Sequence, residues 1–214
     1  MNNLALTYRD AGRPAEALPL VEETSRLQQA NLGPDHVDTV ASLGSLATIY
    51  EQGGDFPQAE TIYRELLASG LRKDGADSAS AAATRASLGR SLLAQQKFAD
   101  AEPVLRAALA IRETKLLDGW LTFDIRNLLG GALAGQKKFV EAEPLLVSGY
   151  EGMKQREAKM GAPNKARLKE ALERLVRYYT DWGQPEKAAA WEQKLEQWIQ
   201  VEAKKKSAGD PKTK

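Results

Sequence analysis

The chain has 214 residues, of which 43% are hydrophobic and 28% are charged, and its formal net charge is +1. It contains no cysteine, which excludes disulfides, zinc-thiolate sites and thiol nucleophiles, and its one histidine argues against a His-based site. No apolar run reaches the roughly 20 residues that span a bilayer. The N-terminal residues lack the basic region of a signal peptide, so we expect a cytoplasmic protein with no membrane contact.

One pattern returns five times along the chain. Leu is followed by a small residue or Val, then by an aromatic residue or Leu three positions later, and by Ala twelve positions after the small residue. The second members of the pattern are Ala5, Ala47, Gly89, Gly130 and Val176. Subtracting successive positions gives spacings of 42, 42, 41 and 46 residues. A period of this length indicates stacked repeats.

Each repeat contains a turn signal between two helical segments. The signals are AGRP around Gly12, GGDFP around Gly54, QQKF before Phe98, QKKF before Phe139 and WGQP around Gly183. Glycine favours the left-handed end of a first helix, and the following Pro or Phe begins a second. Apolar residues recur at helical spacing on both sides of the turns, and no stretch alternates as a strand would. Each repeat is therefore predicted to be a helix pair.

These elements predict an all-α fold, a right-handed α-solenoid of about five antiparallel helix pairs. A single domain is expected over residues 1–200. Its repeats are predicted at about residues 1–34, 35–76, 77–117, 118–161 and 162–200. The small residues let neighbouring helix axes approach to about 8–10 Å. Ala59 and Ala101 are expected to be buried at these crossings.

The loops and the two ends carry further expectations. Helix N-caps are predicted at Asp35, Ser78 and Asn164. The Lys-rich tail at residues 201–214 has no apolar periodicity and is predicted to be disordered. The C-terminal tryptophans and tyrosines are expected to form core rather than a ligand platform. They are Tyr178, Tyr179, Trp182, Trp191 and Trp198.

The N-terminal repeat begins late in its pattern. Met1 stands three residues before Leu4, so about one turn of the first helix is missing compared with the second repeat. The end of a repeat array normally carries a polar cap. The chain is either a piece of a longer protein, which we favour, or its first helix docks onto another surface.

The repeats match a known family in columns, spacing and turns. The helix pair with Leu-small-x-x-Tyr, then Gly, then Ala resembles the tetratricopeptide repeat. The segments NNLALTYRDAGRPAEALPL and LGPDHVDTVASL, with their 42-residue spacing, are similar to the kinesin-light-chain type of that repeat. The last two units also look like repeat arrays appended to bacterial serine/threonine kinases. The chain has no Gly-rich phosphate loop and no HRD or DFG signature, so kinase activity does not follow.

The resemblance implies a noncatalytic protein-interaction scaffold that binds a peptide or partner segment in a concave groove. The alternative is a regulatory or substrate-docking segment of a multidomain serine/threonine kinase, with the kinase domain in the same full-length chain. No catalytic residue, metal or cofactor is expected, because the paired carboxylates lie on solvated helix faces. Nucleic acid is not an expected partner, because the repeats would need a basic groove to bind RNA.

Groove candidates come from the first helix of each repeat. In this architecture the exposed positions lie three before and one after the small residue. These positions and their neighbours include Asn2, Asn3, Leu6, Thr48, Arg90, Asn127, Glu173 and Arg177. Asparagine can hold both the N–H and the C=O of an extended peptide, and the asparagines match groove positions of the family. Gly44 and Ala86 interrupt this series.

The charge distribution suggests which ligand to expect. Residues 1–79 contain six Lys or Arg and twelve Asp or Glu, a balance of −6, so the remainder carries +7. One interpretation is a polar groove in which Arg90 and Arg177 bind an acidic or C-terminal-carboxylate peptide. The other is a solvated surface on which these arginines pair with Glu and Asp of the next repeat.

Overall fold

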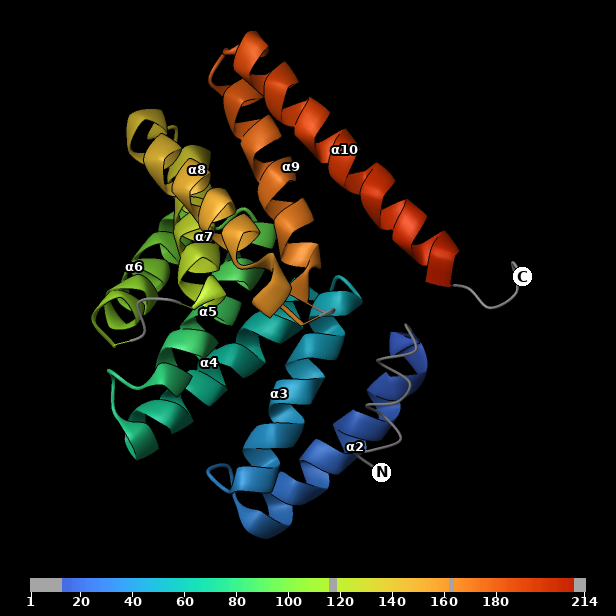
Figure 1. Ribbon diagram of the computed structural model, residues 1–214. Coiled ribbons are helices and arrows are strands. Elements are labelled where there is room, and N and C mark those ends of the chain that lie inside the picture. The colour runs from blue at the N-terminus through green and yellow to red at the C-terminus, as the bar shows by residue number, and fades with distance from the viewer. Residues whose placement is uncertain (1–12, 116–118, 162–163, 210–214) are drawn as a thin grey trace. The chain divides into compact units, whose positions relative to one another are not determined.

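The computed structural model describes residues 13–115, 119–161 and 164–209 (Figure 1). In these ranges the chain forms nine α-helices and one short 3-10 helix, and no strand. It divides into two compact units, residues 1–115 and 116–214. Each unit is a stack of antiparallel helices, which confirms the predicted all-α fold of helix pairs.

The first unit contains five described helices. They are α2 (Pro14–Leu32), α3 (Val37–Gln52), α4 (Phe56–Asp74), α5 (Ala79–Ala94) and α6 (Phe98–Lys115). Each helix contacts the next along the chain, as short interhelical turns require. The second repeat is therefore α3 with α4, and the third is α5 with α6. The first helix of the first repeat is expected within residues 1–12, outside the described residues.

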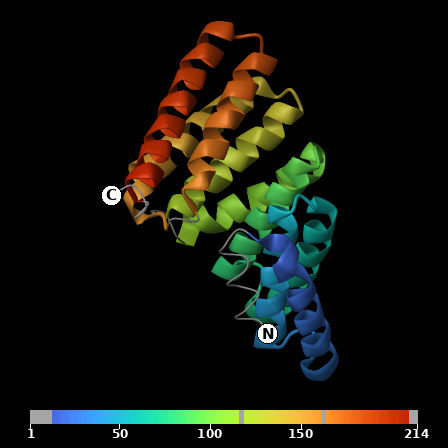
Figure 2. The same cartoon turned by 90° about the vertical axis from the view of Figure 1, so that its right-hand side faces the viewer.

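The second unit contains the fourth and fifth repeats. Its helices are α7 (Trp120–Gly135), α8 (Phe139–Gln155), α9 (Ala166–Asp181) and α10 (Pro185–Gly209), with the 3-10 helix η1 (Glu157–Lys159) after α8. Contacts join α7 to α8 and α9, and join α9 to α8 and α10. Figure 2 shows α10 lying antiparallel to α9 along that helix's length.

The recurring small residues lie where the helices cross. Ala17, Ala59, Ala101 and Ala142 have no exposed surface, and Ala188 is 8% exposed, so the predicted burial of Ala59 and Ala101 is confirmed. The small residue of the fourth repeat is Gly130, and the structure shows why this position has no side chain. A Cβ atom there would lie 2.7 Å from Cγ of Leu146 on the paired helix. Even a methyl group at Gly130 would therefore press against the paired helix, and larger side chains at the alanine positions would hold the helices apart.

The turn within each repeat has the same backbone geometry in the second to fifth repeats. The residue in the left-handed region is Gly54 (φ 81°), Gln96 (φ 59°), Lys137 (φ 62°) or Gly183 (φ 72°). The next residue donates its N–H to the carbonyl five residues back, for example Asp55 to Tyr50 at 2.9 Å. This is the hydrogen bond of a Schellman C-cap. The turns lie where they were predicted, although Gln and Lys occupy two positions that favour glycine.

Replacing Lys137 with Gly is expected to raise the free energy of unfolding by about 0.5–1 kcal/mol, because glycine adopts a positive φ without steric cost. The converse change at the equivalent position of the fifth repeat, Gly183→Ala, should lower it by a similar amount. Urea denaturation of both variants measures the two effects. Equal changes of the same sign would contradict this account of the turn.

Two loop predictions need correction. Ser78 caps α5 as expected, because its hydroxyl accepts the N–H of Ala81 at 3.1 Å. At α3 the cap is His36, whose Nδ1 accepts the N–H of Asp38, while the Asp35 carboxylate binds Arg72 at 2.6 Å. At α9 the N-cap position is Lys165 rather than Asn164, and no side chain makes the cap hydrogen bond.

The C-terminal helix is longer than predicted. α10 continues through Gly209, whereas we predicted disorder from residue 201. No proline or glycine interrupts the sequence between Val201 and Ala208. An ion pair between Lys205 and Glu202, 2.6 Å long and three residues apart, also supports the last turns.

Three of the five aromatic residues predicted to form core in the last repeat are buried, and Trp182 and Trp198 are half-buried. Tyr178, Tyr179 and Trp191 are 1%, 3% and 8% exposed. The Tyr178 ring is 4.7 Å from that of Tyr179, and Trp182 stacks on Phe139 with ring centroids 5.9 Å apart. Aromatic pairs at these distances attract one another beyond their burial. These aromatic contacts stabilise the C-terminal end of the second unit.

Candidate functional site

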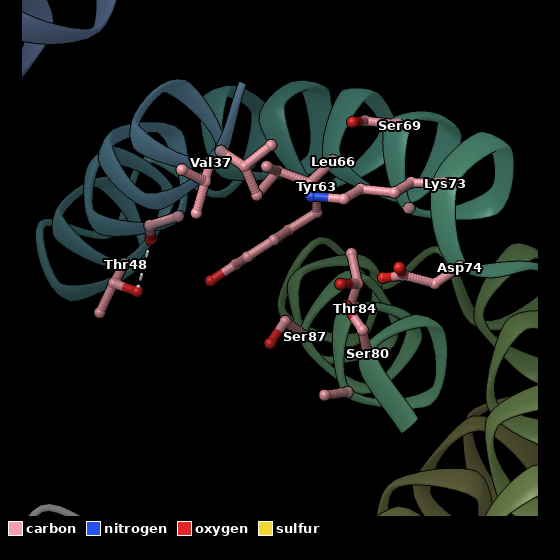
Figure 3. A pocket seen from close by; sticks show the side chains of 14 residues that line it. Val37, Thr48, Tyr63, Leu66, Ser69, Lys73, Asp74, Ser80, Thr84 and Ser87 are labelled. Carbon is pink, nitrogen blue, oxygen red and sulfur yellow. Dashed lines mark hydrogen bonds between the residues drawn. The ribbon is translucent and has the colours of Figure 1, made fainter. Parts of the chain in front are cut away.

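A cavity of about 370 Å³ lies in the first unit between α3, α4 and α5 (Figure 3). Helix α3 contributes Val37, Val40, Gly44 and Thr48. Helix α4 contributes Tyr63, Leu66, Ser69, Gly70, Lys73 and Asp74, and α5 contributes Ser80, Ala83, Thr84 and Ser87. Each set recurs at intervals of one to four residues that bring its members onto one helix face. We call this cavity and the faces that line it the α3–α5 groove.

An internal polar network lies at one end of the groove. Figure 3 shows the Tyr63 hydroxyl pointing to the end where Thr48 and Ser87 lie. This hydroxyl donates to Oε2 of Glu51 at 3.0 Å, and Oε1 of Glu51 lies 3.4 Å from Nε of Arg90. Burial and the charge of Glu51 raise the pKa of Tyr63, and hydrogen bonds from Thr48 and Ser87 partly offset the rise. The network ties α3, α4 and α5 together.

The other end of the groove is lined by polar side chains. Lys73, Asp74, Ser80 and Thr84 lie there, and the Lys73 side chain extends along the groove toward Tyr63 (Figure 3). Within the ranges that the structure describes, Ser80 and Thr84 make no side-chain hydrogen bond. A hydroxyl can both donate and accept, so this end offers hydrogen bonds to a ligand.

The loop beside this end is held by charge. Hydrogen bonds from Arg72 and then Ser69 lower the pKa of Asp35, and the charges of Arg72 and Lys73 lower it further. Arg72 therefore connects the end of α4 to the loop between α2 and α3. The third repeat has an equivalent connection, in which Nζ of Lys115 donates to the carbonyl of Asp77 at 2.7 Å.

Only some of the predicted groove residues line the α3–α5 groove. Thr48 lines the groove, and its hydroxyl donates to the carbonyl of Gly44 at 2.9 Å. Arg90 does not line it, because its side chain is only 11% exposed and is paired with Glu51 of the preceding repeat. Arg90 is therefore paired between repeats, as in the second of the two interpretations, although its partner belongs to the preceding repeat rather than the next one. Asn2, Asn3 and Leu6 fall outside the described residues.

The remaining candidates lie in the second unit. Asn127 is fully buried, donates from Nδ2 to the carbonyl of Leu146 at 3.0 Å, and accepts from Arg174. It is therefore a core residue, inaccessible to a peptide. Glu173 and Arg177 are both exposed on α9, and Glu173 is paired with Lys169 at 3.0 Å. Their role in binding stays a prediction.

The sequence analysis took the groove positions to lie three before and one after the small residue of each first helix. These positions cover one face of each first helix, so most of the residues that line the cavity were missed. The two positions on α3, Gly44 and Thr48, line the cavity, whereas the two positions on α5, Ala86 (2% exposed) and Arg90, do not. The face of α5 that lines the cavity is Ser80, Ala83, Thr84 and Ser87. The signal for this face was its run of small and hydroxyl residues three or four positions apart.

Comparison with known proteins identifies the family. Tetratricopeptide repeat models match residues 1–70, 45–115 and 86–154. The chain belongs to the tetratricopeptide repeat (TPR) family. A search of the curated proteins found no match.

Solved structures show the same fold. A crystal structure of nearly identical TPR-like repeats, described as a kinesin light chain from Podosopora anserina, superposes with a TM-score of 0.70 at 22% identity over 95% of this chain and 94% of that one. BtubC (BKLC) from P. vanneervenii gives 0.67 at 21% identity over 94% and 78%. These superpositions show that the chain shares the fold of those repeat proteins.

In residues 13–115, 119–161 and 164–209, no three or more His, Asp or Glu side chains are placed to hold a metal ion. None of the helices in those ranges combines the length and the hydropathy needed to cross a bilayer.

Proposed function

We propose that this TPR protein is a noncatalytic scaffold that binds an extended segment of a protein partner in the α3–α5 groove. TPR proteins in general are noncatalytic protein-interaction scaffolds. The observation that supports this groove is its cavity, which is bounded by faces of two consecutive repeats. Its volume of about 370 Å³ lies within the range of ligand-binding cavities.

The lining suits a peptide because it combines apolar and hydrogen-bonding surface. Val37 is 63% exposed at the start of α3, and Val40, Leu66 and Ala83 continue the apolar surface within the groove. Ser80 and Thr84 add hydroxyls without partners in the described ranges. Apolar contact supplies affinity, and a few directed hydrogen bonds fix orientation.

The charges favour an uncharged segment at this site. Lys73 and Asp74 line the same end and cancel each other. Binding of an acidic ligand, expected from Arg90 and Arg177, is a separate proposal. It now depends on Arg177 alone, because Arg90 is paired with Glu51. The two ligand classes differ in salt dependence, because screening weakens an acidic ligand and leaves an uncharged one nearly unaffected.

A plugged groove tests the proposal. Ala83→Trp places a large side chain at an exposed position that lines the cavity, and Ala68→Trp places one at an exposed position of α4 that does not. Peptides are selected from a random display library on the wild-type chain. Ala83→Trp should weaken their binding by about tenfold or more, since filling the cavity removes contact area. Equal affinity of the two variants would refute the site.

The kinase-derived alternative concerns the gene rather than the groove. A regulatory or substrate-docking segment of a multidomain kinase would use the same kind of groove. A kinase domain encoded in frame before Met1 would support this alternative, and a stop codon close upstream would exclude it.

A further inference from the structure

The glycines within helices fall into two groups. At Gly89, Gly130, Gly131, Gly149 and Gly152 an added Cβ atom would lie closer than 3 Å to an atom of a neighbouring helix. Packing therefore favours glycine at these positions, most strictly at Gly149, where the nearest atoms include the backbone nitrogen of Asn127 and the backbone oxygen of Phe123. At Gly44 and Gly70 an added Cβ would meet no heavy atom within 4 Å. Packing within the protein does not explain these two glycines.

Glycine inside a helix also has a cost. It loses more backbone entropy on folding than alanine does, so it weakens the helix. Gly44 lies in the middle of α3, and Gly70 lies in the last third of α4. Both glycines line the same cavity from different helices. Their shared consequence is a wider groove in which the helix backbones are accessible.

Hydrogen-bonding groups lie on the third helix of the groove. Ser80 and Thr84 are one helical turn apart on α5, and neither side chain has a hydrogen-bond partner within the described ranges. An extended peptide presents alternating N–H and C=O groups, and each hydroxyl can serve either one. A ligand main chain can reach these hydroxyls only if no bulky side chain separates it from the helices.

Resting on the proposed function, we infer that Gly44 and Gly70 are specificity-determining residues. They admit the main chain of an extended, uncharged segment close to α3 and α4, and Ser80 and Thr84 hydrogen-bond its amide groups. The segment carries small side chains (Gly, Ala or Ser) where it passes the two glycines. A close approach of two backbones is the situation in which glycine is favoured on one side and small residues on the other.

The test uses glycine-to-alanine variants of the whole chain, with the library-selected peptides as probes. Gly53→Ala is the matched control, because Gly53 is exposed at the end of α3, has an ordinary right-handed φ of −77°, and does not line the groove. Gly44→Ala and Gly70→Ala should raise the melting midpoint, yet weaken peptide binding by about tenfold. Gly53→Ala should leave peptide affinity unchanged.

The outcomes separate this inference from the proposed function. If Ala83→Trp abolishes binding but Gly44→Ala and Gly70→Ala do not weaken it, the groove stands and the role of the glycines is refuted. Selected peptides enriched in bulky apolar residues would also refute it. A lower melting midpoint for both glycine variants would show a structural role instead. Unchanged binding by Ala83→Trp, or a selection that yields no peptide, would overturn both proposals.

Discussion

Replacing Gly149 with Ala is expected to lower the free energy of unfolding of the second unit by about 3 kcal/mol. The new Cβ would lie 2.6 Å from the backbone nitrogen of Asn127 and 2.7 Å from the backbone oxygen of Phe123, both on α7. Backbone atoms cannot rotate away as a side chain can, so α7 and α8 must separate. Separation removes contacts along the whole helix pair.

Tryptophan fluorescence during urea denaturation measures this effect in the correct unit. All four tryptophans of the chain lie in residues 116–214, so their emission reports unfolding of that unit. The control is Glu151→Ala, an exposed change on the same helix, which should alter stability by less than about 0.5 kcal/mol. A loss below about 1 kcal/mol for Gly149→Ala would mean that α7 and α8 can separate at little cost.

The opposite result is expected for Gly44→Ala, which fills open space and should stabilise α3 by about 0.5–1 kcal/mol. The two substitutions are chemically identical and both lie within helices. Changes of opposite sign in the free energy of unfolding would show that glycine occurs within these helices for two reasons. One is close helix packing, at Gly149, and the other is an open groove, at Gly44.

The repeat architecture was predictable because many weak signals coincide at one period. Ala59 and Ala101 occupy equivalent positions, so their burial followed from the column rather than from either residue alone. The turns at Gln96 and Lys137 were predicted without glycine, because the flanking columns fix where the first helix must end. Local chemistry was less reliable. Asp35 is a good N-cap residue, but Arg72, distant in sequence, engages its carboxylate.

The groove was harder to predict than the repeats. The spacing of apolar residues shows which face of a helix is buried, but it does not show which other helices lie on either side of that helix. In the α3–α5 groove, α3 and α5 are both first helices, but they line the cavity with different faces. The sequence rule did not include the α5 face with Ser80 and Thr84. The second helix was omitted altogether, although Tyr63, Gly70 and Lys73 on α4 line the same space.

Asn127 shows how a polar residue at a groove position can belong to the core, and its substitution separates the two roles. Asn127→Ala is expected to lower the free energy of unfolding of the second unit by about 2–3 kcal/mol. The change removes the donor to the Leu146 carbonyl and an acceptor of Arg174, and it leaves a space where a fully buried side chain was.

Asn127→Asp is the informative second variant. It keeps an oxygen for Arg174 but places an acceptor against the Leu146 carbonyl, so it should also destabilise the unit, although without opening a cavity. Both variants are compared by tryptophan-detected urea denaturation and by affinity for the selected peptides. A core residue changes the unfolding curve and leaves the affinity of the folded protein for its peptide intact. If instead both variants unfold as the wild type does but lose the peptide, Asn127 is a ligand-binding residue and its assignment to the core is wrong.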